Sequence, residues 1–380
     1  MIVGRILFDG MNKTCIAAAL LLAPVIATSQ IVVSGQTAVQ FYKSAATTSP
    51  RSMNSGRPSF GLESDLFLDG YVNDNVAGLV NARVLDNGSA YFDYVAIRLA
   101  NLTPLNLNIL AGKFDLPFGN LGERIFPRQN PLFGLPVLYD YRTALPARVT
   151  TERDILAAEG SGSGMYLLDG GIYDIGMMVC GSFGIVDYAV AVTSGTISET
   201  SYGGGNTNSD FGKLIRLAVT PFVGLTVGGA YAWGPYLEET STSLPRAIDV
   251  NTYNQRAMEF DIEFSRGYGV LNAEGVYSTY QVPLETNDET FRVLGFSVEG
   301  KYTVMPRLYL ALRLSGMHFG EALLGGTEQP WDYDVTEFEG GLGYFLYKDV
   351  LLKLVRRETR IHGTTMPKDN LTVLQLVVAY

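Results

Sequence analysis

Apolar and polar residues alternate with a period of two along much of this chain. In Leu308–Ser315 every even position is Leu, whereas the odd positions are Tyr, Ala, Arg and Ser. In Met258–Phe264 every odd position is acidic. Successive side chains of a β-strand point to opposite faces of the sheet, so this pattern predicts strands with one apolar and one charged face. A soluble β-sandwich also alternates, and the spacing of the strands and their connections decides between the two folds.

The alternating segments predict 16 strands at regular intervals. Their approximate cores lie at residues 31–43, 59–72, 77–86, 90–101, 105–116, 170–181, 184–195, 212–220, 224–236, 253–265, 269–281, 290–303, 307–319, 333–346, 350–362 and 370–380. Each strand with its connection takes about 22 residues, which suits membrane spans of about 9–11 residues joined by loops. After Gln30 no run of 18 apolar residues occurs, so no membrane-spanning helix is expected.

The predicted connections alternate between short and long. Tight turns are expected at 73–76, 102–104, 182–183, 221–223, 266–268, 305–306 and 347–349. Longer connections are expected at 45–58, 119–169, 196–211, 237–252, 283–289, 320–332 and 363–369, with 87–89 as a short member of this set. Short turns at one end and long loops at the other are typical of an outer-membrane barrel, in which closure removes the edge strands. The predicted fold class is therefore all-β, a transmembrane antiparallel β-barrel.

Residues 1–29 have the pattern of an export signal. Lys13 is followed by the apolar segment Cys15–Ala27 and then by small residues that suit cleavage. Such a segment is too short for a transmembrane helix and is typical of a secretory signal peptide. We therefore expect residues 1–29 to be a signal peptide, with an approximate cleavage site, and residues 30–380 to form the barrel. Cys180 is interpreted as a small apolar residue of the barrel.

The last predicted strand, Leu371–Tyr380, ends on an aromatic residue. Leu374, Leu376 and Val378 share a face with Tyr380. This segment is similar to the C-terminal signal that the outer-membrane assembly machinery recognises in barrel proteins. The similarity implies that Tyr380 contacts this machinery and that the chain resides in the outer membrane of a Gram-negative bacterium. Outer-membrane lipid and lipopolysaccharide would then surround it.

The composition excludes several classes of function. The chain has 28 Lys and Arg against 38 Asp and Glu, a formal net charge of −10, so nucleic acid is not an expected partner. Its 2 Cys and 2 His lack the spacing of a zinc site, and no metal or cofactor is expected. His318 lies two positions before Gly320, so its strand has no close His-x-Ser pair. The sequence therefore predicts no catalytic residues and no enzyme.

The face of the predicted barrel opposite the Leu-rich face carries many charges. Its acids are Glu63, Asp65, Asp69, Glu259, Asp261, Glu263, Glu274, Glu299, Glu337 and Glu339, and its basic residues are Arg98, Lys113, Arg216, Lys301, Arg313, Lys353 and Arg357. An Arg or Lys that faces lipid at mid-depth costs about 2–4 kcal/mol, so these side chains require a water-filled interior. They either line a channel or brace the wall through ion pairs.

The connection 119–169 is far longer than the others, and we expect it to fold into the barrel. It contains Arg124, Arg128, Arg142, Arg148 and Arg153 together with several acids. Prolines stiffen it, because each fixes its own backbone φ. Opposing charges at a constriction create a transverse field that selects polar solutes. The alternative is an exposed loop that packs on a neighbouring subunit.

The segment Ala111–Gly119 reads Ala-Gly-Lys-Phe-Asp-Leu-Pro-Phe-Gly and resembles a segment of the bacterial outer-membrane porins, including the phosphate-selective porin-like family of the porin superfamily. In those proteins it ends a strand and leads into a long loop. The resemblance implies passive diffusion of small hydrophilic solutes or ions, usually through a trimer. Anion-selective members carry lysine-rich constrictions, whereas this sequence has a net acidic wall and a charge-balanced long loop.

We therefore predict a water-filled porin channel with a constriction between the long loop and the wall. The candidate constriction residues are Arg124, Arg128, Arg142 and Arg148 of the loop, the wall acids Glu259, Asp261 and Glu263, and the opposing basic wall residues Lys113 and Arg313. The acidic balance indicates a weak preference for cations. The alternative prediction is a non-conducting outer-membrane barrel that acts as an adhesin or as a structural protein of the envelope.

Overall fold

The computed structural model describes residues 30–44, 53–86, 88–103, 106–170, 172–200, 208–238, 248–285, 287–363 and 368–380. The predicted signal peptide at residues 1–29 lies outside the described residues, and so does its cleavage site.

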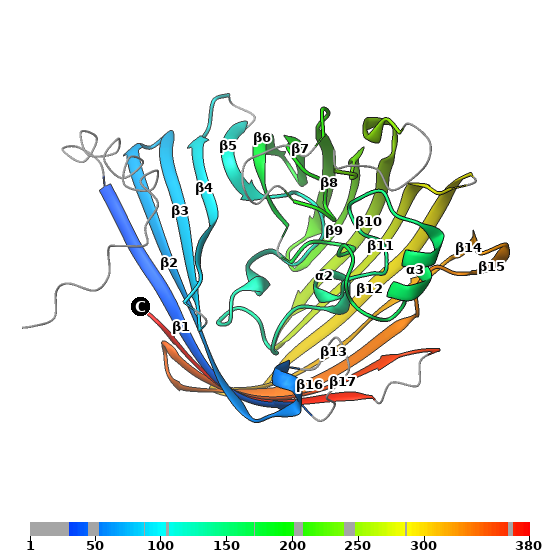
Figure 1. Ribbon diagram of the computed structural model, residues 1–380. Coiled ribbons are helices and arrows are strands. Elements are labelled where there is room, and N and C mark those ends of the chain that lie inside the picture. The colour runs from blue at the N-terminus through cyan, green and yellow to red at the C-terminus, as the bar shows by residue number, and fades with distance from the viewer. Residues whose placement is uncertain are drawn as a thin grey trace, which may run out of the picture.

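Sixteen strands of the described residues close into one antiparallel barrel (Figure 1). They are β1 Gln30–Ser44, β2 Ser59–Asn73, β3 Val76–Leu85, β4 Ala90–Leu99, β5 Asn108–Asp115, β6 Tyr173–Phe183, β7 Val186–Thr193, β8 Gly212–Phe222, β9 Leu225–Pro235, β10 Asn254–Arg266, β11 Gly269–Pro283, β12 Asp288–Met305, β13 Leu308–Phe319, β16 Val335–Tyr347, β17 Val350–Ile361 and β18 Asp369–Ala379. Each strand pairs with the next along the chain, β13 pairs directly with β16, and β1 closes the ring against β18. The predicted fold class is confirmed, and each predicted segment overlaps one of these strands.

The remaining elements are short. They are the 3-10 helices η2 Met53–Gly56, η3 Gly122–Ile125 and η4 Val250–Thr252, the helices α2 Val137–Asp140 and α3 Glu152–Ala158, and the hairpin strands β14 Glu321–Leu324 and β15 Thr327–Pro330. Within the described part of the chain, no helix is long and apolar enough to cross a membrane. The hairpin lies in a connection for which the sequence predicts no strands. Gly325 and Gly326, with φ of 59° and 78°, form its two-residue turn.

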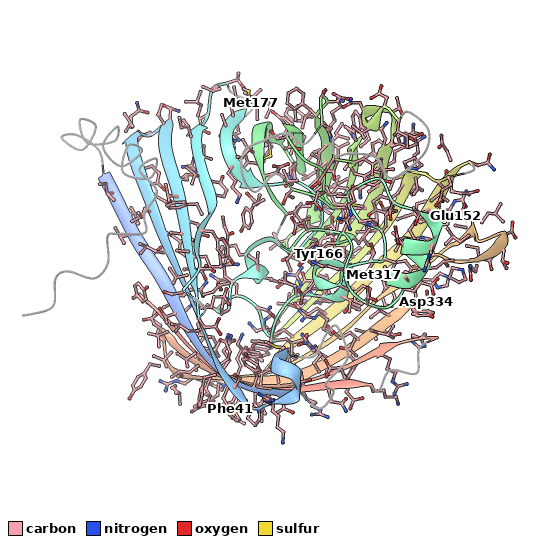
Figure 2. All side chains as sticks on the ribbon, in the orientation of Figure 1. Phe41, Glu152, Tyr166, Met177, Met317 and Asp334 are labelled. Carbon is pink, nitrogen blue, oxygen red and sulfur yellow. The ribbon has the colours of Figure 1, made fainter. Side chains whose placement is uncertain are left out.

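The two faces of the barrel strands differ as the alternation predicts. In β13, Leu310, Leu312 and Leu314 are 50%, 57% and 44% exposed, whereas Arg313 is 2% exposed. Phe41 also lies on the outer surface (Figure 2). The outside of the barrel is therefore apolar, as a hydrocarbon environment requires, and polar and charged side chains are turned inward.

Aromatic side chains gather where the strands meet the short turns. Phe183, Phe222, Tyr268, Tyr302, Tyr347 and Tyr380 all lie at or beside these turns and are exposed. Amphipathic rings favour the level of the lipid headgroups, where one end is apolar and the other wet. These residues therefore form a girdle at the short-turn end of the barrel.

Both ends of the barrel segment lie at the short-turn end. Gln30 pairs with Tyr71, close to the β2–β3 turn. Tyr380 exchanges two backbone hydrogen bonds of 2.9 Å with Gly35. A Cβ atom on residue 35 would lie 2.7 Å from the Tyr380 ring, so glycine permits this approach. The terminal aromatic residue is thus part of the closure between β1 and β18.

The connection between β4 and β5 differs from the prediction. A tight turn is predicted at 102–104, but β4 ends at Leu99 and β5 begins at Asn108. Asn101 and Asn106 have φ of 55° and 50° in the left-handed region, which Asn tolerates better than most residues. The connection between the two strands is therefore longer than predicted, and β5 is short.

Parts of the long loop, residues 116–170 between β5 and β6, contact inward-facing side chains of the barrel strands. Figure 1 shows its helix α2 surrounded by the strands, and α2 contacts β12, β13 and β16. The amide of Val137 at the start of α2 donates a hydrogen bond to Ser315 Oγ of β13 (3.2 Å). Polar inner-wall side chains thus satisfy backbone groups of the loop, which irregular backbone at this depth requires.

Candidate functional site in the barrel lumen

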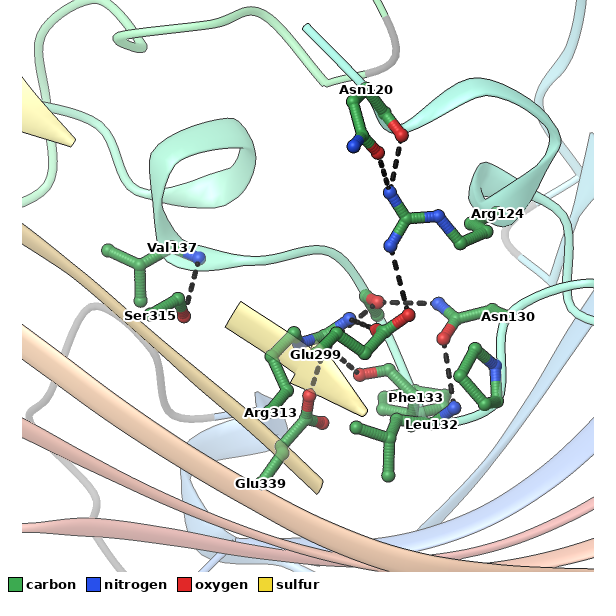
Figure 3. A network of polar contacts seen from close by, with 12 residues as sticks. Asn120, Arg124, Asn130, Leu132, Phe133, Val137, Glu299, Arg313, Ser315 and Glu339 are labelled. Carbon is green, nitrogen blue, oxygen red and sulfur yellow. Dashed lines mark hydrogen bonds and ion pairs between the residues drawn. The ribbon is translucent and has the colours of Figure 1, made fainter. Parts of the chain in front are cut away.

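Glu299 of β12 joins the long loop to the wall. Its Oε1 accepts a hydrogen bond from Arg124 Nη1 of the loop (2.9 Å), and its Oε2 accepts one from Arg313 Nη1 of β13 (3.2 Å) (Figure 3). Both Glu299 and Arg313 are 2% exposed. Removing either partner of such a buried pair leaves an uncompensated charge, so the pairing holds the loop and the wall together.

Arg313 has further partners on both sides. It forms an ion pair with Glu339, which lies opposite it on the neighbouring strand β16. Its Nη2 also donates to the loop carbonyl oxygens of Phe133 (3.3 Å) and Gly134 (3.1 Å). The planar guanidinium group offers five N–H donors in a fixed fork, which is why one Arg can connect two wall acids and the loop backbone.

Lys353 of β17 holds the same part of the loop. Its Nζ donates to the carbonyl oxygens of Pro127 (2.8 Å), Asn130 (3.1 Å) and Leu132 (2.7 Å). An ammonium group has three donors, and all three are used here. Lys353 therefore binds residues 127–132 of the loop at three points, and Tyr309 adds a hydrogen bond to the Pro131 carbonyl oxygen (3.2 Å).

A third anchor lies at β11. Glu274 accepts hydrogen bonds from the Tyr139 hydroxyl (2.6 Å) and from the Asn120 amide (3.2 Å). Burial, and next the negative charge of Glu274, raise the pKa of Tyr139 well above its ordinary value. The phenol therefore keeps its proton and remains the donor.

The opposite wall has its own charge cluster around Arg83 of β3. Its Nε lies 2.8 Å from Asp65, 3.2 Å from Asp93 and 3.4 Å from Glu63. The guanidinium carbon lies 5.5 Å from the centre of the Phe126 ring of the long loop. This is within the distance of a cation–π contact, so the cluster faces the loop.

Two of the predicted wall acids are paired with a basic residue of the wall. Arg216 of β8 donates to Glu259 (3.0 Å) and to Asp261 (2.6 Å), both on β10. Both acids are buried, whereas Glu263 on the same face is exposed close to the β10–β11 turn. The structure thus places Glu259 and Asp261 in a wall cluster with Arg216 rather than in contact with the loop arginines.

The other predicted loop arginines have separate partners. The Arg128 guanidinium donates to the Lys348 carbonyl oxygen (3.2 Å) and lies 3.5 Å from Asp349. Arg142 stacks on Tyr166, with its guanidinium carbon 4.2 Å from the ring centre. Arg148 is exposed. Of the four, Arg124 is the one brought to the Glu299 and Arg313 cluster.

The remaining predicted basic wall residue, Lys113, lies on the other side of the barrel from Arg313. It is 9% exposed, and its Nζ donates to the Phe92 carbonyl oxygen of the adjacent strand β4 (2.9 Å). Asp93 attracts its charge. Lys113 thus belongs with the charges around Arg83 and does not share a cluster with Arg313.

The two histidines lie on the rim at the long-loop end. His318 Nδ1 is 2.5 Å from Asp334, and His362 Nε2 is 2.7 Å from Thr336 Oγ1. Both contacts join the end of one strand to a neighbouring segment. In the described residues no cluster of three or more His, Cys, Asp or Glu is arranged to hold a metal ion.

Two cavities lie beside the long loop, toward the Arg83 wall. The larger, of about 470 Å³, reaches from Phe126 toward Tyr71 near the short turns. The smaller, of about 250 Å³, is lined by Ile125, Pro127 and Arg83. The loop segment 125–127 and Arg83 therefore form the boundary between the two spaces.

Neither a family model nor a curated protein matches this sequence. Solved structures do match. The outer membrane channel DcaP of Acinetobacter baumannii is 11% identical, with 93% of this chain and 98% of that chain covered and a TM-score of 0.62. The trimer form of OmpT, an outer membrane protein of Vibrio cholerae, is 12% identical, with 93% and 100% covered and a TM-score of 0.59. The anion-selective porin from Comamonas acidovorans is 10% identical, with 93% and 100% covered and a TM-score of 0.56.

This chain has the porin fold. The porin-like segment Ala111–Gly119 ends β5 and leads into the long loop, where the resemblance implies it should lie. Gly112 has a φ of 129°, and a Cβ atom there would lie 2.3 Å from the Val95 carbonyl oxygen. Glycine is therefore needed at position 112, because any larger residue would clash with β4 and would be strained at this φ.

Sequence reasoning missed part of the charge cluster on the β2–β4 wall. Arg83 lies opposite Asp65 in the β2–β3 register, and the alternation from Asp65 onward could have revealed it. Asp93 was hidden by an irregularity between Asn81 and Ala82, which shifts the pairing of β3 with β4 by one residue. A one-residue shift turns the following side chains to the other face, so a strict alternation cannot place them.

Proposed function

We propose that this protein is an outer-membrane porin that forms a water-filled channel for passive diffusion of small hydrophilic solutes or ions. The observation that carries the proposal is a closed barrel with an apolar outside and a charged inside, in which cavities remain beside the long loop. An interior with this many charges needs water. The porin fold shared with DcaP, described as an outer membrane channel, supports the same function.

The apolar outer face and the aromatic girdle support an outer-membrane location, with the short turns on the periplasmic side. A homotrimer is also part of the proposal, supported by the trimer form of the Vibrio cholerae protein with the same fold.

The proposed channel acts by diffusion and not as an enzyme. A closer relation to the phosphate-selective porin-like family is supported by Ala111–Gly119 alone.

The long loop sets the width of the proposed channel. Its polar anchors lie on β11, β12, β13 and β17. On the other side Phe126 touches Arg83 and Phe67, and the proposed route runs through the cavities beside this contact. The sequence-predicted constriction residues remain part of the proposal, with Arg124 and Arg313 acting by holding the loop. Asp65, Asp93 and Glu63 around Arg83 support the weak cation preference.

Planar-bilayer recording with the purified, folded protein tests the channel. Discrete conductance steps in KCl are expected, and a reversal potential in a salt gradient should favour potassium. A protein that inserts but gives no steps would contradict the proposal in favour of a non-conducting barrel. A reversal potential that favours chloride would contradict the cation preference alone.

Replacing residues 121–168 by a short Gly-Ser linker tests the role of the long loop. The conductance per step should rise, because the loop no longer fills the lumen. As a control, Val223→Ser in the exposed turn between β8 and β9 should leave the conductance unchanged. An unchanged conductance after removal of the long loop would show that the loop does not limit the channel.

A further inference from the structure

The larger cavity beside the long loop has the size of a ligand site. Its volume of about 470 Å³ falls within the range of roughly 300–1,000 Å³ that is usual for small-molecule sites. It is bounded by the β2–β6 wall on one side and by the loop on the other. It lies on the side of the loop where the proposed route runs.

Aromatic rings from both sides line this cavity. They are Phe67, Tyr71, Tyr94 and Tyr173 of the wall and Phe118 and Phe126 of the loop. Phe67 and Phe126 meet edge to face, with ring centres 5.0 Å apart, and so join the wall to the loop. The faces and edges of these rings present an apolar surface, which is unusual for a passage that only conducts water and inorganic ions.

The charges of the cavity are mostly unpaired acids. Asp69, Asp115 and Glu123 line it, and none of them forms an ion pair with another described residue. Of the two basic lining residues, Arg216 is neutralised by its two carboxylate partners in the wall. Arg98 lies over Tyr71, with 5.9 Å between the guanidinium carbon and the ring centre. The cavity is therefore net negative.

A buried acceptor adds to this pattern. Asn81 lines the cavity and is 3% exposed, and its Oδ1 has no hydrogen-bond partner among the described residues. Buried polar atoms are nearly always hydrogen-bonded, so this oxygen calls for a donor. An ammonium or guanidinium group supplies N–H donors as well as the positive charge that the acids attract.

We propose that this cavity is a binding site for organic cations, in which carboxylates hold an amine or guanidinium group and the rings hold its aromatic or aliphatic body. The inference rests on the proposed channel function and names the class of solute that the channel favours. Aromatic faces attract cations and apolar groups alike, and the acids exclude anions of the same shape. A weak site of this kind retains the solute and still lets it leave.

Current block by matched probes tests the site. Phenethylammonium has the ring and the charge, ethylammonium lacks the ring, and phenylacetate reverses the charge. In about 0.1 M KCl, where screening extends over about 10 Å, phenethylammonium should block at the lowest concentration. Ethylammonium should need at least roughly threefold more, since it loses the contacts with the rings. Phenylacetate should not block in the same range.

Two variants separate the charges from the rings. In the triple variant Asp69→Asn, Asp115→Asn, Glu123→Gln the half-blocking concentration of phenethylammonium should rise at least roughly tenfold. A control with the same charge change at exposed acids outside the cavity, Asp74→Asn, Asp86→Asn, Glu328→Gln, should stay close to the wild type.

Replacing Tyr94 by Leu tests the rings. This variant should weaken block by phenethylammonium about threefold and leave block by ethylammonium unchanged. Equal loss for both amines would mean that the ring acts only through the packing of the wall.

The outcomes distinguish the site from the channel. Suppose that both triple variants show normal conductance steps and that phenethylammonium blocks them equally well. This result would overturn the binding site and leave the channel proposal intact. Block by phenylacetate as strong as block by phenethylammonium would do the same. If no steps are seen, equilibrium dialysis of phenethylammonium against the detergent-folded barrel still decides the site. Binding that the cavity triple variant loses would support it, and no binding would overturn it.

Discussion

At the scale of single residues, the inner charges divide into those that brace the barrel and those that face open space. Arg313 and Arg216 each join two acids of the wall, whereas Asp69 and Asp115 have no cationic partner among the described residues. A charge that is paired with an opposite charge stabilises the wall, but its partner cancels most of its electric field in the lumen. The unpaired acids act at a distance on a solute, and so does a cluster with surplus charge, such as the three acids that share Arg83.

Replacing Arg313 by Ala should destabilise the barrel strongly. Glu299 and Glu339 would remain buried without their partner, and the loss of one member of a buried pair costs about 3–5 kcal/mol. Urea unfolding of the detergent-folded protein measures this change. The exposed Arg57→Ala variant is the control and should unfold like the wild type. Equal unfolding midpoints for Arg313→Ala and wild type would show that the acids find other partners.

Asp332, outside the barrel strands, should make stability depend on pH. Burial raises its pKa to about 7, although it accepts three backbone N–H groups, from Ala144, Gly160 and Tyr333, each at 2.8 Å. Between pH about 4 and 7 the folded protein keeps a proton that the unfolded chain has released. The free energy of unfolding therefore falls as the pH rises through this window and levels off above it.

Urea unfolding of the wild type and of Asp332→Asn at several pH values tests this dependence. The difference between their unfolding free energies should change from pH about 4 to 7 and stay constant at higher pH. The exposed Asp86→Asn variant should run parallel to the wild type throughout. Parallel curves for Asp332→Asn would contradict the raised pKa.

At the scale of elements, most polar anchors of the long loop come from one side of the barrel. Lys353 and Arg313 donate hydrogen bonds to backbone carbonyl oxygens of the loop. The hydroxyl group of Tyr139 in the loop donates to Glu274 of β11. Toward β2–β6 it touches the wall through Phe126, beside Arg83 and Phe67, and leaves a cavity next to this contact. An irregular segment inside a barrel must satisfy its backbone groups from the wall, which is what these polar anchors do. The larger cavity lies on the side of the loop that has fewer of them.

Replacing Lys353 by Met should loosen the loop. The variant keeps most of the side-chain volume but leaves the carbonyl oxygens of Pro127, Asn130 and Leu132 without this donor. Each buried group left unsatisfied costs about 1–3 kcal/mol, so the loop should visit other positions. We expect an open-channel current with larger fluctuations in bilayer recordings. The exposed Lys348→Met variant should show the noise of the wild type, and equally quiet currents in both would mean that the other anchors suffice.

At the scale of the whole molecule, closure joins the two ends of the barrel chain. β1 pairs with β18 over residues 36–44, and Tyr380 is hydrogen-bonded to Gly35 through its backbone. The exposed Tyr380 ring lies in the girdle at the short-turn end. Its backbone and its ring thus have separate roles, the first in closure and the second at the membrane interface.

Replacing Tyr380 by Ala should reduce assembly in cells more than folding in the test tube. The backbone hydrogen bonds to Gly35 are kept, so refolding into lipid vesicles should stay close to the wild type. The amount of folded protein in the outer membrane should fall several-fold if the assembly machinery reads the ring. Tyr347→Ala, which removes another exposed ring of the same girdle, is the matched control. Equal levels in the cell for both variants would contradict a special role for Tyr380.

The strands and the faces of the barrel could be predicted because they depend on local sequence. The period of two in β13 follows from side chains that alternate along any strand, and the breakers between strands are also local. The limits of this reasoning appear where local geometry changes, as at the asparagines between β4 and β5 or at the irregularity beside Asn81. There a shift of one residue alters which side chains face inward.

The sequence alone therefore determined that this chain forms a barrel with a charged interior and a long connection after β5. Only the tertiary structure decided which charges meet. Arg124 reaches Glu299 across 175 residues of sequence, and Glu259 is neutralised by Arg216 two strands away. Alternation places a side chain on a face, but contact depends on register, closure and the path of the loop. These are set by the packing of the whole barrel, and so the unpaired acids of the proposed solute site became visible only there.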